Sequence, residues 1–166
     1  MDSIVYARSA LPANVVTGRN PFPRTVLSGA DSVQRPNVVP GVPLYLYGPY
    51  PGGKAINPNA FSIPAAGQGD LSRNALRGFN ATQVDFTLRR MFMSERFSLQ
   101  SSADMFNIFN HPNFGAPINY MTSPQFGQST QTLNSWLGGG GQSGGLNPLY
   151  QIGGPRSVQL ALKLQF

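Results

Sequence analysis

Apolar and polar side chains alternate with a period of two in several segments of the chain. The most regular segment is "RSVQLALKLQF" at residues 156–166. One parity of this segment is apolar throughout: Val158, Leu160, Leu162, Leu164 and Phe166. Because successive side chains of a β-strand point to opposite faces, the alternation predicts a strand with one apolar and one polar face. Similar patterns predict strands at residues 82–92 and 96–108, and a β-rich but mixed segment predicts another at residues 3–11.

The two middle strands also have apolar rows, and the row of the second strand is weaker than that of the first. The first comprises Val84, Phe86, Leu88 and Phe92, and the second comprises Phe97, Leu99, Ala103 and Met105. Arg90 alone interrupts the first row, near the end of its segment. A long side chain at such a position can bend its charge toward water. We therefore expect both segments to carry one apolar face.

The connections between the expected strands are very unequal. A tight turn of about three residues near Ser94 joins the two middle strands. The segments at residues 12–81 and 109–155 are rich in proline and glycine, and we expect irregular excursions there rather than elements of a core. Counting the strand crossings places the short turn on one side and both long loops on the other. This arrangement is typical of an outer-membrane β-barrel and predicts an all-β fold of antiparallel, up-and-down transmembrane strands.

The composition agrees with a sheet that faces lipid. Only 11% of the residues are charged, against roughly 25% in an average soluble protein, whereas 40% are hydrophobic. The net charge of +6 is scattered along the chain, which favours a solvated basic surface over a binding site for nucleic acid, anionic lipid or lipopolysaccharide. In the last strand, Lys163 has the polar parity. The five apolar side chains of that strand would gain on the order of 10 kcal/mol in hydrocarbon.

Candidate catalytic and metal-binding groups are few. Cysteine is absent, and His111, which precedes Pro112, is the only histidine, so we expect a turn residue there. Residues 48–54 match the phosphate-loop pattern, but Ala55 replaces the serine or threonine that would hold Mg²⁺, so we interpret them as a Pro-Gly loop. Asp85 and Asp104 would oppose each other across the tight turn, and a register shift of two residues would separate them.

We expect these two carboxylates to line a barrel lumen, with Arg89 or Arg96 as candidate partners. The four glycines at residues 138–141 indicate a loop tip, and Trp136 and Tyr150 on either side are candidate interface or ligand-stacking residues. The sequence therefore predicts a protein that is not an enzyme and that uses no cofactor or metal.

Three stretches resemble a known family: "GDLSRNALRGFNATQVDFTLRR" at residues 69–90, "ADMFNIFNHPNFGAP" at 103–117 and "GGPRSVQLALKLQF" at 153–166. They are similar to the C-terminal end of the β-barrel of TonB-dependent outer-membrane receptors, in the subgroup that often carries an N-terminal carboxypeptidase-regulatory-like domain. Residues 7–18 resemble a segment that precedes these stretches in such proteins. The resemblance implies that residues 1–166 are the C-terminal part of a barrel, with extracellular loops at residues 12–81 and 109–155.

The resemblance also implies a function and a set of partners. The function is energised uptake of a large nutrient, a carbohydrate, peptide or metal chelate, across the cell outer membrane. The partners are the rest of the barrel and its plug, the TonB system through an N-terminal part, outer-membrane lipid and the barrel-assembly machinery, with no nucleic acid. Terminal strands of the family end in an aromatic residue that this machinery recognises. The corresponding signal would be Phe166, with Leu160, Leu162 and Leu164.

The chain departs from the family in having no recognisable signal peptide, TonB-contacting segment or plug, and about four strands in place of about 22. Even the smallest membrane barrels need about eight strands, so we expect an incomplete barrel and a fragment of a receptor. The alternative is a small soluble β-domain that binds a partner or a carbohydrate through its Gly/Pro-rich loops. Such a domain would be soluble and would unfold cooperatively in dilute buffer, whereas the fragment would aggregate or need detergent.

Overall fold

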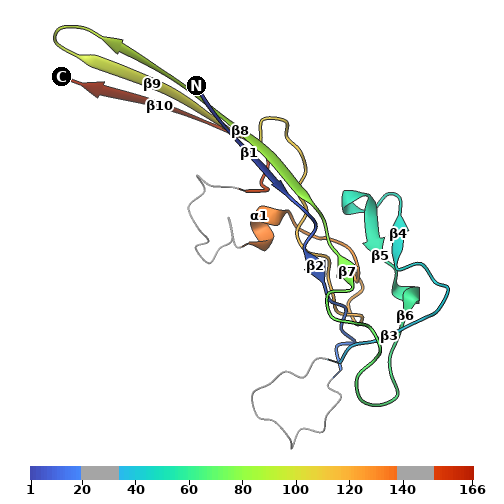
Figure 1. Ribbon diagram of the computed structural model, residues 1–166. Coiled ribbons are helices and arrows are strands. Elements are labelled where there is room, and N and C mark those ends of the chain that lie inside the picture. The colour runs from blue at the N-terminus through green and yellow to red at the C-terminus, as the bar shows by residue number, and fades with distance from the viewer. Residues whose placement is uncertain (20–33, 138–151) are drawn as a thin grey trace, which may run out of the picture. The chain divides into compact units, whose positions relative to one another are not determined.

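The computed structural model (Figure 1) describes residues 1–19, 34–137 and 152–166. The chain divides into two compact units. The first, called the sheet unit below, comprises Met1–Ser9, Asn80–Asn113 and Thr132–Phe166. The second, called the loop unit, comprises Ala10–Phe79 and Phe114–Gln131.

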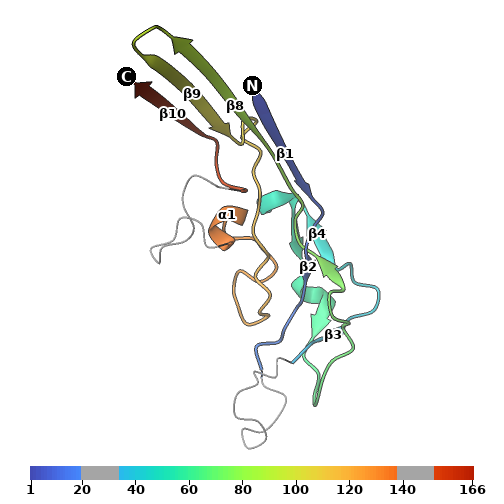
Figure 2. The same ribbon diagram turned by 60° about the vertical axis from the view of Figure 1, so that its left-hand side comes forward.

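The sheet unit contains one sheet of four long strands. These are β1 (Asp2–Arg8), β8 (Ala81–Met93), β9 (Ser98–Phe106) and β10 (Ser157–Gln165), in the order β1-β8-β9-β10. Every neighbouring pair is antiparallel, as Figures 1 and 2 show. Within the described residues, β1 and β10 each pair on one side only, so the sheet is open. The predicted fold class is confirmed: antiparallel strands of an incomplete barrel.

The connections are sorted to the two ends of this sheet. The strands β8 and β9 are joined by a short turn in which the Ser94 backbone N–H donates to the Phe97 carbonyl oxygen at 2.8 Å. The segments between β1 and β8 and between β9 and β10 both leave from the opposite end, because all four strands alternate in direction. Short and long connections are therefore separated as the sequence predicted.

The register avoids opposed carboxylates. Asp104 lies opposite Thr87, and Ser98 lies opposite Met93. This pairing is shifted by two residues from the one that would place Asp104 opposite Asp85. Like charges at directly opposed positions repel, whereas a shift of two keeps every side chain on its own face. The turn is longer than predicted as a result.

The loop unit has three small antiparallel sheets. They pair β2 (Pro12–Ala13) with β7 (Leu76–Arg77), β3 (Asn37–Val38) with β6 (Phe61–Ser62), and β4 (Tyr45–Tyr47) with β5 (Lys54–Ile56). Two single-turn 3-10 helices, η1 (Pro51–Gly53) and η2 (Pro58–Ala60), lie on either side of β5.

The described part of the two long connections also forms a hydrophobic core, so the expectation of excursions without a core is wrong there. The core residues are Ala13, Val15, Ile56, Ala60, Phe61, Leu71, Leu76 and Phe126. The rings of Phe61 and Phe126 meet edge to face with their centroids 6.2 Å apart, although they come from different connections. Apolar side chains from distant segments bury one another here, and strands of two or three residues are too short to show a period in the sequence.

The only helix longer than a single 3-10 turn among the described residues is α1 (Leu133–Trp136), in the sheet unit. The Thr132 side chain caps it by accepting a hydrogen bond from the Ser135 backbone N–H at 3.4 Å. Trp136 is partly exposed on this helix. The glycines at residues 138–141 and Tyr150 lie outside the described residues. No helix in the described ranges has the length and apolar character needed to cross a membrane.

Candidate functional site

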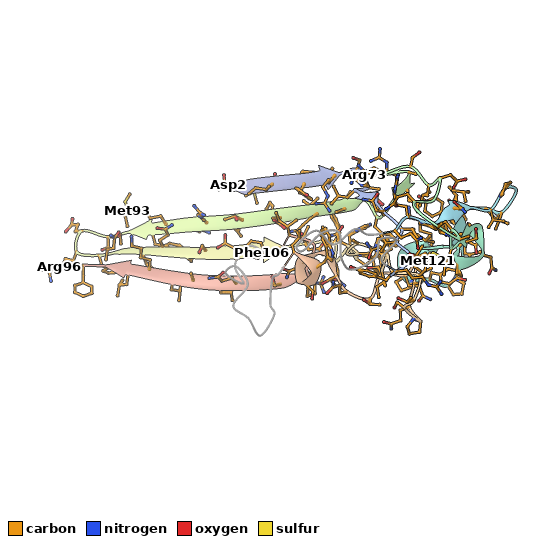
Figure 3. All side chains as sticks on the ribbon, turned by 90° about the horizontal axis from the view of Figure 1, so that it is seen from below. Asp2, Arg73, Met93, Arg96, Phe106 and Met121 are labelled. Carbon is orange, nitrogen blue, oxygen red and sulfur yellow. The ribbon has the colours of Figure 1, made fainter. Side chains whose placement is uncertain are left out.

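The first functional feature is the apolar face of the four-stranded sheet. The register places these side chains on it: Val5, Val84, Phe86, Leu88, Phe92, Leu99, Ala103, Met105, Val158, Leu160, Leu162 and Leu164. They lie along the strands that run between the turn near Met93 and Arg96 and the end of β9 at Phe106 (Figure 3). Leu160 is 77% exposed and Leu162 is 76% exposed. A continuous exposed row of this kind marks an interaction surface rather than a chance distribution.

The lengths of β8, β9 and β10 suit a membrane, whereas β1 has 7 residues. A transmembrane β-strand needs about 9–11 residues when it is tilted. β9 and β10 each have 9 residues, and β8 has 13. The apolar face can therefore extend across a hydrocarbon layer, where each large side chain would contribute about 1.5–3 kcal/mol.

Arg90 is the one charged residue on the apolar face. Its guanidinium carbon lies 4.8 Å from the centroid of the Phe92 ring, which is two residues nearer to the turn. The side chain is thus directed toward the end of the sheet, as its position in the sequence predicted. Cation–π contact with Phe92 and an exit from the apolar layer both reduce the cost of this charge.

The opposite face is polar and carries Asp85 and Asp104. The Thr87 hydroxyl donates to one Asp104 oxygen at 2.8 Å, and the Gln83 side-chain amide donates to both Asp85 oxygens at 2.8 and 3.1 Å. Asp85, Thr87, Arg89 and Asp104 border a hollow of about 370 Å³.

The candidate arginine partners of these carboxylates are not found. No ion pair joins Asp85 or Asp104 to Arg89 or Arg96 among the described residues, which corrects that prediction. Neutral donors on neighbouring positions satisfy the carboxylates instead. The two-residue shift gives Asp85 and Asp104 separate hydrogen-bond partners. The polar face of the sheet is therefore a surface of hydrogen-bonded side chains.

A buried polar cluster, which the sequence reasoning did not find, fixes the end of the sheet opposite the turn. We call Gln83, Asn107 and Asn113 the polar clasp; they are 3%, 1% and 2% exposed. Asn113 accepts from the Thr82 backbone N–H at 2.8 Å and donates to the Thr82 carbonyl at 3.0 Å. Because both bonds go to the backbone, Asn113 extends the edge of β8 as another strand would.

The polar clasp also holds the segment that enters β10. The Asn107 side-chain amide donates to the Gly154 backbone carbonyl at 2.8 Å, and the Gln83 side-chain oxygen Oε1 accepts from the Gly153 backbone N–H at 2.6 Å. Gly153 has a φ of +78°, and an added Cβ would lie 2.6 Å from the Cβ of Leu133. Only glycine fits this position without strain. The sequence features that could have indicated the polar clasp are the asparagines of "NIFNHPNFG" and the glycines that precede β10.

His111 contributes its backbone to this same cluster, just after the turn at residues 108–109. Its backbone N–H donates to the Asn107 side-chain oxygen at 3.0 Å, and its carbonyl accepts from the Asn107 and Asn113 amides. The His111 ring is exposed, and its Nδ1 lies 3.3 Å from the Thr82 hydroxyl oxygen, within hydrogen-bond distance. No group of three or more His, Cys, Asp or Glu residues that could hold a metal occurs among the described residues.

The phosphate-loop pattern forms a hairpin tip between β4 and β5. The ammonium group of Lys54 donates to the Arg77 carbonyl at 3.3 Å and lies over the rings of Tyr45 and Phe79, at 5.1 and 5.5 Å from their centroids. Partial burial lowers the pKa of Lys54 from its ordinary value. Lys54 is therefore engaged by protein groups, which agrees with a structural loop.

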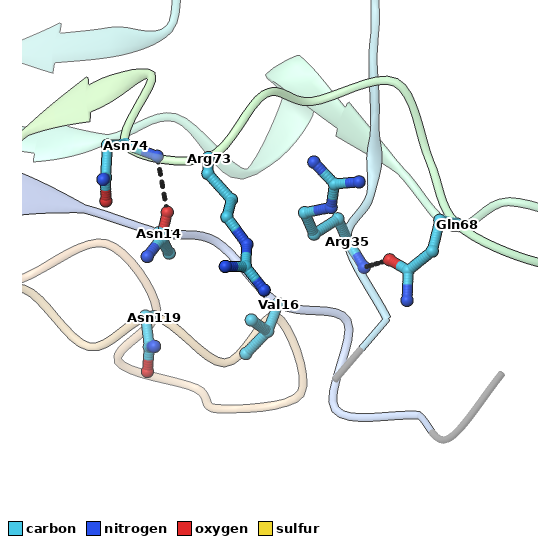
Figure 4. A pocket seen from close by; sticks show the side chains of 7 residues that line it. All are labelled: Asn14, Val16, Arg35, Gln68, Arg73, Asn74 and Asn119. Carbon is cyan, nitrogen blue, oxygen red and sulfur yellow. Dashed lines mark hydrogen bonds between the residues drawn. The ribbon is translucent and has the colours of Figure 1, made fainter. Parts of the chain in front are cut away.

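The loop unit contains one further hollow, of about 570 Å³ (Figure 4). Its lining comprises Asn14, Val16, Arg35, Gln68, Arg73, Asn74 and Asn119. Two cations and four side-chain amides converge on it, and none of the seven residues is acidic or aromatic. Sequence reasoning did not identify this hollow, because its residues come from four separate segments of the chain.

Comparison with known proteins assigns the chain to a family. A family model described as "Outer membrane beta barrel domain" matches residues 1–137, which include β1, β8 and β9. Neither the curated proteins nor the solved structures gave a match. The matched part is more than half of the 166 residues. The chain belongs to the outer membrane β-barrel domain family, and its sheet is part of an outer-membrane barrel.

Proposed function

We propose that the chain is the C-terminal part of the barrel of a TonB-dependent receptor, which takes up a large nutrient without catalysing a reaction. The observation that carries this proposal is the four-stranded sheet with one exposed apolar face, joined to a loop unit with its own core. The sequence resemblance at residues 69–90, 103–117 and 153–166 narrows the proposal from an outer-membrane barrel to this receptor class.

The open edges of the sheet indicate what completes it. β1 and β10 each leave one side of their backbone unpaired among the described residues. Roughly ten backbone groups in hydrocarbon, each costing several kcal/mol, would cost more than the apolar face returns. In the proposed receptor, further strands of the same barrel pair with both edges, and a plug fills the lumen that the polar face lines.

The loop unit would supply extracellular binding surface in this receptor. Its core and three small sheets give it a defined shape, so it can present side chains in fixed positions. The alternative of an independent soluble β-domain is less favoured, because the family assignment and the exposed Leu160 and Leu162 side chains both point to a membrane.

Two requirements of energised uptake test the proposal. Deletion of TonB, or collapse of the proton gradient, should abolish uptake of the nutrient by cells that contain the full-length protein, while binding of the nutrient at the cell surface persists. Uptake that continues unchanged without TonB would contradict the proposal and indicate a passive pore.

A further inference from the structure

The hollow of the loop unit is held open by contacts within the protein. The Asn14 side-chain oxygen accepts from the Asn74 backbone N–H at 2.7 Å, and the Arg35 backbone N–H donates to the Gln68 side chain at 2.9 Å (Figure 4). The Val16 backbone N–H also donates to the Asn119 carbonyl at 2.9 Å. These hydrogen bonds connect the walls of the hollow to one another.

The charge of the hollow is positive. Arg35 and Arg73 lie next to each other in Figure 4, with the Arg73 side chain extending toward Val16. Arg35 donates to the Leu71 carbonyl at 3.0 Å, whereas the Arg73 guanidinium has no hydrogen bond or ion pair among the described residues. The nearby Asp70 accepts from the Val38 backbone N–H at 2.7 Å instead. An arginine fork without a protein partner matches a carboxylate of a ligand.

The remaining lining specifies the rest of the ligand. Side-chain amides both donate and accept hydrogen bonds, which suits hydroxyl groups, and Val16 is the only apolar side chain in the lining. A volume of about 570 Å³ lies within the usual range for small-molecule sites of about 300–1,000 Å³. An apolar ligand would offer no hydrogen-bonding group to this polar lining, and a neutral sugar would offer no negative charge to Arg73.

We infer that the hollow binds a sugar acid, with the carboxylate on Arg73 and the hydroxyl groups on the surrounding amides. This inference rests on the proposed function, since it names the class of nutrient that the extracellular loops of the receptor would bind.

Binding to the purified full-length protein in detergent tests the inference. The probes are galacturonic acid and its dimer, with galactose and its dimer as neutral controls and an acidic dipeptide as another source of carboxylate. Isothermal titration should show the sugar acids binding at least tenfold more tightly than either alternative. Equal or tighter binding of the neutral sugar or the dipeptide, or no binding of the acids, would overturn the inference.

Two substitutions localise the effect. Arg73→Gln should weaken binding of the sugar acid at least tenfold. The affinity of Arg73→Lys should lie between those of the wild type and Arg73→Gln, because lysine keeps the positive charge but cannot form two parallel hydrogen bonds to a carboxylate. Arg96→Gln makes the same change of charge in the turn of the sheet and should leave binding unchanged. An Arg73→Gln variant that binds like the wild type would also overturn the inference. Because TonB-dependent uptake is measured independently, failure here would leave the proposed function standing.

Discussion

Substitution of Leu160 by arginine separates a lipid-facing sheet from a soluble one. Leu160 lies near the middle of β10, 77% exposed and opposite Ala103. Arginine on the lipid face near mid-bilayer costs about 2–4 kcal/mol, and the lost leucine contact with hydrocarbon adds about 1.5–3 kcal/mol. We therefore expect Leu160→Arg to lower the free energy of unfolding by about 3.5–7 kcal/mol. In water, the same change at so exposed a position would stay within about 0.5 kcal/mol.

The adjacent residue supplies the matched control. Ala161 lies on the polar face, opposite Ser102, so Ala161→Arg should cost less than about 1 kcal/mol. The assay is urea unfolding of the full-length protein refolded into lipid vesicles, which avoids any effect on the assembly machinery. Equal losses for the two variants, or no loss for Leu160→Arg, would refute the assignment of the faces.

Three further changes test other parts of the structure. Asn107→Ala removes the side-chain bonds of a residue that is 1% exposed and has a φ of 49°, and should lower the free energy of unfolding by about 2–4 kcal/mol in the same assay. Gly153→Ala, which forces a Cβ against Leu133, should lower the free energy of unfolding more than Gly67→Ala. Gly67 also has a positive φ, +66°, but no atom beyond its two chain neighbours lies within 4 Å of the Cβ that alanine would add there. Equal losses for the two variants would show that the contact with Leu133 does not matter. Deletion of Phe166 should reduce the amount of protein in the outer membrane without changing refolding into vesicles, as immunoblots of membrane fractions and refolding yields would show.

The sheet could be predicted from the sequence because its determinants are local. Alternation of apolar and polar residues within one strand determines the face of the sheet on which each side chain lies. Repulsion between Asp85 and Asp104 in the unshifted pairing favours the observed register of β8 and β9. The sorting of the connections followed from the number of crossings alone. Each of these inferences needs only neighbouring residues or adjacent strands.

The polar clasp and the loop unit could not be predicted in this way. Asn107 and Asn113 occur in a segment whose composition is that of a loop, and their burial depends on Gly154, 47 residues from Asn107, and on the backbone of Thr82. The core of the loop unit joins Phe61 to Phe126 across separate connections. Long-range packing of this kind leaves no periodic signal in a single sequence.

The exposure of β10 to lipid can be measured residue by residue. The 166 residues contain no cysteine. Single cysteines at Leu160, Ala161, Leu162 and Lys163 can each carry a spin label, with any cysteine elsewhere in the full-length protein replaced by serine. In the full-length protein in vesicles, labels at Leu160 and Leu162 should collide preferentially with oxygen dissolved in lipid. Labels at Ala161 and Lys163 should collide preferentially with a water-soluble nickel complex. Accessibility to the nickel complex that is the same at all four positions would contradict the claim that hydrocarbon covers the apolar face.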